Sequence, residues 1–193
     1  MSEHRRPGRP QIADPDGIAR IAATLFAEHG YAGVSMDDIA VRSGVSRRTL
    51  FRHFANKADL VWRDFFVNYH RLAQRLEADD SAPGLAGLRA ALREALAESD
   101  EAEDISRVRL RIIGASPEVF AAGVGALRDM TDGFAHHLAR DGAIAQDGLE
   151  ARALGQAITG CILESAVWWA SGSDDAFVDV VDRALERLGA GLE

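Results

Sequence analysis

Apolar residues recur every three to four positions along most of the chain, the spacing that gathers them on one face of an α-helix. The first such run follows Asp14-Pro15, an N-cap and a proline at the first helical position, and ends at His29-Gly30. Its apolar positions are Ile18, Ile21, Ala22, Leu25 and Phe26. Strand-like alternation is nearly absent and proline is rare after Pro15, so the pattern predicts an all-α fold.

The same spacing predicts further helices in the second part of the chain. They cover about 57–76, capped by Asn56 with Asp59, then 83–96, 117–140, 148–171 and a last helix capped by Asp174. Residues 99–104 are predicted to form an exposed acidic linker. Arginines at 107, 109 and 111 alternate with apolar residues as in a strand, but so short a run beside Ile113-Gly114 favours a short helix.

Two very short helices joined by a tight turn are predicted between Ser35 and Phe54. Ser35 caps the first, and Asp38 three residues later suits a capping box. Gly44 is suited to the left-handed conformation that ends a helix, and Ser46 caps the second helix. On that second helix Leu50 and Phe54 point inward together. Arg47, Arg48, Thr49 and Phe51 then lie near its outer N-terminal end, as in a helix that reads a DNA major groove.

Charge is distributed unevenly along the chain. The formal net charge is −8, yet residues 1–57 carry nine basic and six acidic residues, which leaves −11 for the remainder. A basic head on an acidic body attracts phosphate at one end only. We therefore divide the chain into 1–57, a basic arm and helix-turn-helix DNA-binding domain, and 58–193, a larger helical bundle. The arm residues Arg5, Arg6 and Arg9 either enter a minor groove or form a charged terminus.

The segment that follows the two short helices completes a recognisable pattern. Ser35-Met36-Asp37-Asp38-Ile39-Ala40, Gly44 to Phe54 and Asn56-Lys57-Ala58-Asp59-Leu60 resemble the TetR family of transcriptional regulators over residues 15–65. The resemblance implies that Ser35 and Met36 touch the DNA backbone and that Lys57 meets a phosphate; an ordinary surface lysine is the alternative. It also implies a DNA-facing set of Ser46, Arg47, Arg48, Thr49, Phe51, Arg52 and His53. The family usually has tyrosine where this chain has Phe51, so a hydroxyl bond to phosphate is not expected there.

By the same resemblance the body is an antiparallel helical bundle that encloses a ligand cavity and forms a homodimer. Residues 58–65 and 107–113 are similar to the subgroup that includes mycofactocin-associated regulators, which implies an acyl-CoA-like ligand. The predicted ligand-binding residues are Trp62, Phe65, Phe66, Tyr69, Leu110, Phe134, Ile158 and Trp168. Arginines 107, 109 and 111 are suited either to a CoA phosphate or to ion pairs with the acidic residues before them.

The two C-terminal helices are the predicted dimer interface, where four helices from two chains would pack. Small residues on the helix over 148–171 favour close helix approach. The doublet Trp168-Trp169 cannot face a single core, because neighbours on a helix diverge. One tryptophan is therefore expected to line a cavity and the other an interface.

Signals of other functions are weak. Asp129, Asp132 and His136 share a helix face, but no further ligand accompanies them, and a solvated face is the simpler interpretation. No grouping typical of a catalytic site is found, so we expect neither an enzyme nor a cofactor. The single Cys161 excludes an intramolecular disulfide, the N-terminus lacks an apolar signal region, and the longest apolar run, 157–170, is too short to cross a membrane. A cytoplasmic protein is expected.

These observations predict a repressor that binds a palindromic operator as a dimer and is released by a small apolar ligand. The alternative is a dimeric DNA-binding protein that needs no ligand and whose body serves only for assembly. A body this large exceeds what dimerisation alone demands, which favours the first.

Overall fold

The structure, a computed structural model, describes residues 14–78, 82–98 and 102–191. Over these ranges the chain forms nine α-helices and no strand, which confirms the all-α prediction. The helices are α1 Pro15–His29, α2 Met36–Ser43, α3 Arg47–His53, α4 Lys57–Glu77, α5 Gly84–Ala97, α6 Glu103–Ala115, α7 Pro117–Leu138, α8 Leu149–Ala170 and α9 Phe177–Ala190. The arm and its arginines lie outside the described residues.

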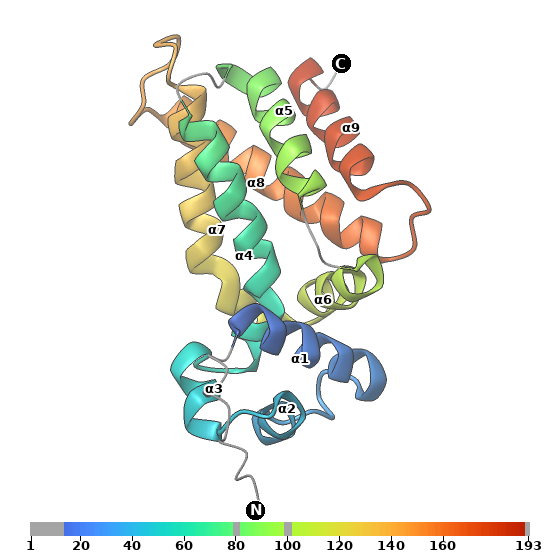
Figure 1. Ribbon diagram of the computed structural model, residues 1–193. Coiled ribbons are helices and arrows are strands. Elements are labelled where there is room, and N and C mark those ends of the chain that lie inside the picture. Colours follow the sequence, from blue (N-terminus) through green and yellow to red (C-terminus); the bar gives the residue numbers. More distant parts are fainter. Residues whose placement is uncertain (1–13, 79–81, 99–101, 192–193) are drawn as a thin grey trace, which may run out of the picture.

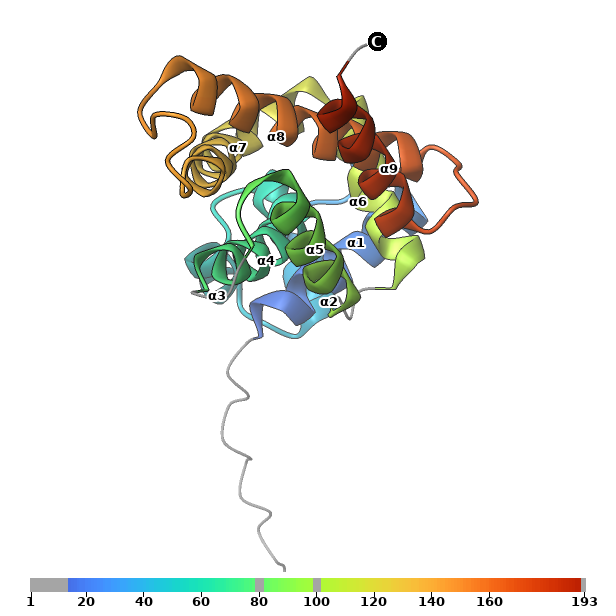
Figure 2. The same ribbon diagram turned by 90° about the horizontal axis from the view of Figure 1, so that it is seen from above.

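Helices α1 to α3 form one end of the molecule and α5 to α9 the other (Figure 1). Helix α4 connects them, since it packs against α1 and also against α5 and α7. Seen from above, α7, α8 and α9 lie on one side of the body, and α4 and α5 lie on the other (Figure 2). A displacement of α4 therefore acts on both ends of the molecule.

Local capping signals explain where most helices begin. The Asp14 carboxylate accepts from the backbone N–H groups of Asp16 and Gly17 at 3.1 and 3.0 Å, and Asn56 with Asp59 forms a capping box. The predicted cap Asp174 is wrong: α9 begins after Ala176, without a side-chain cap. The predicted acidic linker is also too long, because Glu103 already belongs to the first turn of α6, where the helix dipole favours an acidic residue.

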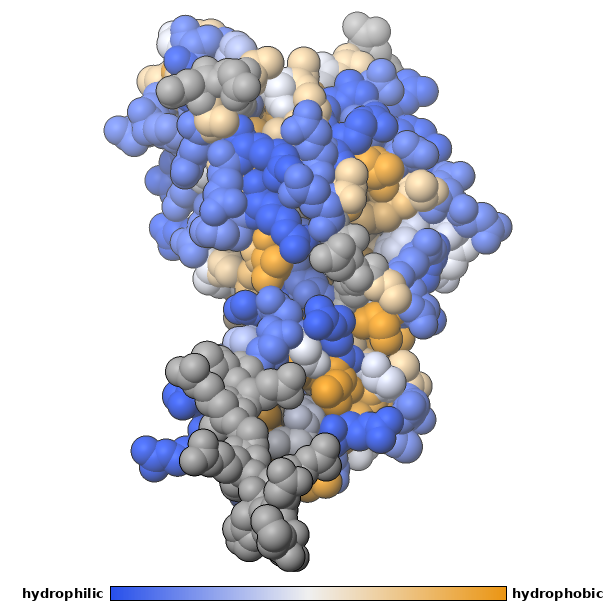
Figure 3. All heavy atoms as spheres, in the orientation of Figure 1, coloured by the Kyte–Doolittle hydropathy of each residue, from blue (hydrophilic) through white to orange (hydrophobic). Residues whose placement is uncertain are grey.

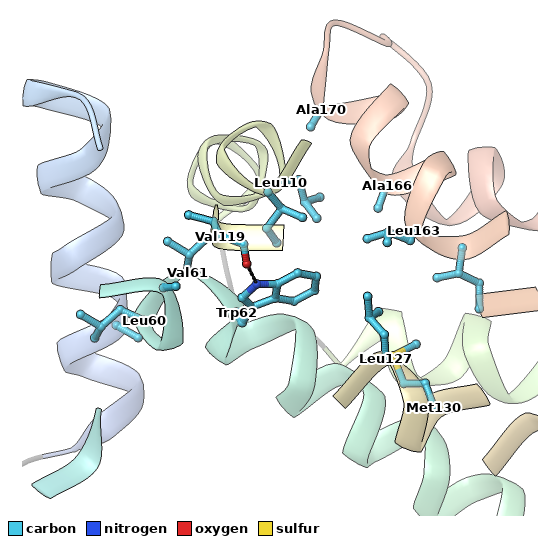
Figure 4. Packing of buried hydrophobic residues seen from close by; sticks show 14 of the residues in the cluster. Leu60, Val61, Trp62, Leu110, Val119, Leu127, Met130, Leu163, Ala166 and Ala170 are labelled. Atoms are coloured by element: carbon cyan, nitrogen blue, oxygen red, sulfur yellow. Dashed lines mark hydrogen bonds between the residues drawn. The ribbon is translucent and has the colours of Figure 1, made fainter. Parts of the chain in front are cut away.

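Trp62 ties α4 to the start of α7. Its ring is 1% exposed, and its indole Nε1–H donates to the carbonyl of Val119 at 2.7 Å (Figure 4). A Cβ atom at Gly123 on α7 would run into the same indole. This glycine therefore provides the space in which the tryptophan packs.

The small residues of α8 act as predicted at Gly155. A Cβ atom there would collide with the backbone of α7 at Thr131 and Ala135. Across the same contact the Thr131 hydroxyl donates to the Thr159 hydroxyl at 3.1 Å. Helices α7 and α8 thus approach closely because neither carries a large side chain at this point.

On the face shown in Figure 3, hydrophilic residues predominate and hydrophobic residues form separate small patches. Among the described residues, no single helix has the length and hydropathy of a membrane span. Among the described helices, only α6 and α7 taken together have that length and hydropathy, and the two helices are bent by 101° relative to each other.

Candidate nucleic-acid interface and ligand cavity

The turn between α2 and α3 is built as the sequence predicts. Gly44 has φ 68° and ψ 21°, a left-handed conformation that suits glycine, and its N–H donates to the last carbonyls of α2. Leu50 is completely buried and Phe54 is 3% exposed, so α3 is held to the head by this one face. The opposite face of α3 is left for a partner.

That opposite face carries basic and aromatic side chains. The exposed residues are Arg47, Arg48, Phe51, Arg52 and His53. Ser46 caps the helix by accepting from the Thr49 N–H at 3.1 Å, and the two hydroxyls lie 2.9 Å apart. The helix is only seven residues long, so these side chains form one compact patch. Its size and composition suit a DNA groove.

The arginines of this patch are only weakly held. Arg47 Nη1 lies 3.3 Å from the Asp37 carboxylate, and its guanidinium lies 5.4 Å from the centre of the Phe51 ring. Both members of that ion pair are more than half exposed, so water screens it and a DNA phosphate can replace the aspartate. Within the described part of the chain, Arg48 forms no ion pair.

Ser35 and Met36 lie at the N-terminal end of α2. The Ser35 hydroxyl donates to Asp38 at 2.6 Å, and the Ser35 N–H donates to the same carboxylate oxygen at 2.8 Å. These hydrogen bonds lower the pKa of the Asp38 carboxyl. Met36 is half-buried against the core of the head. The structure thus assigns both residues a role in folding, and their contact with DNA stays a prediction.

Lys57 has partners within the head. Its ammonium group donates to the carbonyls of Tyr31 and Val34 at 2.5 and 2.8 Å and lies 4.1 Å from the centre of the Tyr31 ring. Burial lowers the pKa of Lys57, and the nearby Glu118 opposes this shift. These contacts stabilise a cation at the first turn of α4 even when no DNA is bound. The contact of Lys57 with a DNA phosphate stays a prediction.

A cavity of about 350 Å³ lies in the body between α4, α5, α6, the end of α8 and the start of α9. Most of its wall is apolar. The lining residues are Val61, Asp64, Phe65, Asn68, Arg93, Leu96, Ala97, Glu103, Ser106, Arg109, Leu110, Ile113, Trp169, Ala176, Phe177 and Val178. Its volume is at the lower end of the range found for small-molecule sites.

Two of the eight predicted ligand-binding residues, Phe65 and Leu110, line this cavity. The other six lie elsewhere: Trp62, Phe66, Tyr69, Phe134, Ile158 and Trp168. Phe66 stacks on the Trp62 ring at 5.3 Å between ring centres. Tyr69 donates to the Asp129 carbonyl at 3.0 Å and packs edge-on against the buried Phe134. These side chains form the α4–α7 contact, not the cavity wall.

The two tryptophans of the doublet point in different directions, and Trp169 rather than Trp168 faces this cavity. Trp169 is 2% exposed, lines the cavity and donates from its indole N–H to the Asp175 carbonyl at 3.0 Å. Trp168 is 58% exposed on the outer side of α8, where it borders a separate pocket formed with the mostly polar residues 171–175. Trp168 therefore does not line this cavity and Trp169 does, because successive residues on a helix point about 100° apart. Which of them binds a ligand stays a prediction.

The three arginines of α6 serve three different purposes. Arg107 lies over the Trp169 ring at 3.9 Å, pairs with Glu103 at 2.7 Å and donates to the carbonyls of Trp169 and Ser173. Arg109 is 2% exposed and pairs with Asp64 on α4. Arg111 is exposed and donates to the Arg107 carbonyl one turn earlier at 3.2 Å. Arg107 thus has the ion pair with the preceding acidic residues that was one of its two predicted uses.

Comparison with known proteins covers the head and the body separately. The family described as bacterial regulatory proteins of the tetR family matches residues 18–62, and the family described as the MftR C-terminal domain matches residues 82–193. A Mycobacterium tuberculosis protein named as a mycofactocin biosynthesis transcriptional regulator, MftR, is 32% identical over 100% of this chain and 98% of its own length. The chain belongs to the TetR family. It has an MftR-type C-terminal domain.

Solved structures of other TetR-type regulators share the fold. SmeT, the repressor of a multidrug efflux pump of Stenotrophomonas maltophilia, aligns with a TM-score of 0.63 at 24% identity over 90% of this chain and 87% of its own. Bacillus subtilis FadR in complex with stearoyl-CoA aligns with a TM-score of 0.62 at 23% identity, covering 92% and 98%. This TetR-family chain is accordingly a DNA-binding transcriptional regulator and not an enzyme.

Sequence reasoning missed much of the cavity wall of this TetR-family regulator, although a signal was present. On α4 the wall residues Val61, Phe65 and Asn68 follow helical spacing, and on α6 Ser106, Leu110 and Ile113 do the same. The arginine alternation in α6 drew attention to charge, whereas the helical face was the better guide. Asp64 and Arg109 belong to the same two faces.

Proposed function

We propose that the protein is a dimeric repressor of the TetR family that binds a palindromic operator and is released by a mostly apolar ligand. Residues 1–57 read the DNA, and residues 58–193 bind the ligand and form the dimer. DNA is the partner of the head, and the chain acts where chromosomal DNA is, in the cytoplasm.

The observation that carries this proposal is the two-sided construction of α3. Its buried Leu50 fixes the helix to the head, while Arg47, Arg48, Arg52, Phe51 and His53 remain on the surface. Arg47 and Arg48 stand in the first turn of this short helix, where the dipole disfavours a cation, so helix stability does not explain them. The same groups are the ones that bind phosphates and guanine edges.

Dimerisation is supported by the outer surface of α8. Leu154 and Trp168 are 46% and 58% exposed on one side of α8, and Leu149 is 83% exposed at the first residue of the helix. A twofold interface through α8 and α9 would cover them. Twofold symmetry would also present two copies of α3 to successive major grooves, about 34–36 Å apart.

A ligand is supported by the cavity and by what the similar proteins bind. An apolar space beside α4 is not needed for assembly alone, which argues against a ligand-independent DNA-binding protein. FadR of Bacillus subtilis holds stearoyl-CoA. An acyl-CoA-like ligand would place its apolar part in the cavity, and its binding would release DNA only if the released state binds it more tightly.

The test is selection of binding sites from a random duplex pool with the full chain, followed by sedimentation of the complex. We expect two inverted half-sites about one helical turn apart and two chains per duplex. A monomeric chain, or a single unrepeated half-site, would contradict the proposal.

A further inference from the structure

One ion pair in the cavity wall, Arg109 with Asp64, is more buried than the other charged groups around the cavity. Besides its apolar wall it is bordered by four ionisable side chains: Asp64, Arg93, Glu103 and Arg109. Arg93 bonds Asp182 on α9 at 2.6 Å, and Glu103 bonds Arg107 at 2.7 Å. In each of these pairs one side chain is more than half exposed. In contrast, the Arg109 side chain is 3% exposed and the Asp64 side chain 18%.

A guanidinium this deeply buried beside an apolar cavity is costly unless a carboxylate accompanies it. Here the carboxylate comes from Asp64 on the neighbouring helix α4. A buried ion pair is seldom a net gain in stability over apolar residues of the same volume, so packing alone does not account for it. Its place in the cavity wall gives it a use in recognition.

We propose that Arg109 is the receptor for a carboxylate group of the ligand, which replaces the carboxylate of Asp64. This inference rests on the proposed ligand-responsive function but departs from an acyl-CoA in one respect. An acyl-CoA is a thioester and has no free carboxylate on its acyl chain, so the class of ligand named here is one free carboxylate on an apolar body. The planar guanidinium matches a carboxylate in shape and charge, and Asp64 already accepts from its Nη1. The apolar body lies against Phe65, Leu110, Ile113 and Trp169. A phosphate dianion suits the site less, because Asp64 and Glu103 would repel it.

The exchange alters how α4 is held. Asp64 ties α4 to α6, while the preceding residue, Arg63, bonds Asp16 at the start of α1 at 2.7 Å. When the ligand takes over Arg109, the Asp64 carboxylate turns toward water and α4 loses this ion pair with α6, yet it keeps its ion pair with the head. Ligand binding and the position of the head are thereby linked through one helix.

The experiment uses the full chain and three probes of equal length: decanoate, decanol and decylamine, below the concentrations at which they aggregate. Binding is measured by calorimetry and by the shift of the melting temperature. We expect decanoate to bind at least about tenfold more tightly than decanol, and decylamine more weakly than decanol. Equal binding of decanoate and decanol, or binding of neither, would overturn the proposal.

Two variants change the preference in opposite directions. Arg109→Gln should remove the advantage of decanoate over decanol, whereas Arg109→Lys should keep part of it. Asp64→Asn removes the competing carboxylate, so it should strengthen decanoate binding and enlarge the melting shift even if Arg109→Gln proves too unstable to study. The control is Arg111→Gln on the same helix, which should bind both probes as the unaltered chain does. Retained preference in Arg109→Gln, or weaker decanoate binding in Asp64→Asn, would refute the assignment.

Operator binding separates this inference from the function on which it rests. If the unaltered chain and Arg109→Gln both bind operator but decanoate releases only the unaltered chain, both proposals stand. Operator binding without any response to decanoate rejects the carboxylate site and leaves the regulator intact. Failure of the unaltered chain to bind any selected duplex rejects the regulator itself.

Discussion

Helices α3 and α6 each carry three arginines, but the surroundings of these side chains differ. In α3 all three are exposed, and Arg47 has only a screened surface pair with Asp37. In α6, Arg107 is bound by two carbonyls and an aromatic ring, and Arg109 is buried against Asp64. Arginine content alone therefore does not identify a DNA-binding helix. The guanidinium groups of Arg107 and Arg109 in α6 are already bound by other groups of the protein, whereas those of α3 are open to a partner.

The largest expected effect comes from placing the same substitution in each helix. Arg109→Met removes the bond from the buried guanidinium to the partly buried Asp64 carboxylate and should reduce the free energy of unfolding by about 1.5–3 kcal/mol. Arg48→Met on the exposed face of α3 should change it by no more than about 0.5 kcal/mol. Urea denaturation of the two variants provides the comparison. Similar losses in both would show that the arginines of α3 and α6 do not differ as the contacts suggest.

The second prediction concerns DNA binding, for which the larger effect is expected in α3 and not in α6. Arg47→Ala and Arg48→Ala should each reduce discrimination between the selected operator and a shuffled duplex by about 1–3 kcal/mol, because these side chains are placed to reach base edges. Arg111→Ala, also exposed but in the body, is the matched control and should bind both duplexes unchanged. Fluorescence anisotropy at fixed salt measures all three. Unchanged operator preference in both α3 variants would show that α3 does not read the sequence.

Lys57 belongs to the basic head by sequence, yet its contacts resemble those of Arg107. Lys57→Met leaves the Tyr31 and Val34 carbonyls without their ammonium partner, so we expect a loss of about 1–3 kcal/mol in the free energy of unfolding. The slope of operator affinity against salt tests the phosphate contact that the sequence predicts, because an ammonium group that stays bound inside the head leaves the slope unchanged. If instead the slope falls by about one unit while stability is unchanged, Lys57 contacts a phosphate in the complex.

The extent to which the structure was predictable differs between the two ends. In the head each helix end depends on residues a few positions away, such as Ser35 with Asp38 or Gly44 at its turn, so its helices could be placed from sequence. The cavity depends instead on which faces of α4, α5, α6 and α9 meet. Phe65 lines it and Phe66 does not, although they are neighbours of the same type. Helical spacing puts Phe65 on one face with Val61 and Asn68, but it does not tell which face of α4 meets the cavity. Likewise, the partners of Lys57 lie 26 and 23 residues away.

The smallest expected effect concerns the adjacent histidines at the end of α7, which repeat the contrast between exposed and buried groups. His137 is 1% exposed, with Nε2 3.2 Å from the Gly84 carbonyl, and burial lowers its pKa. The unfolded chain therefore binds a proton near pH 6.5 that the folded chain still excludes, so stability should fall as the pH decreases below about 6.5. His137→Gln should flatten this dependence of the melting temperature between about pH 5 and 7, whatever packing it loses, because the slope reports only the proton. His136→Gln, at an exposed neighbouring position, should leave the slope as it is. An equal change in both variants would mean that burial of His137 does not govern the response, and the contrast between buried and exposed groups would then not extend to this helix.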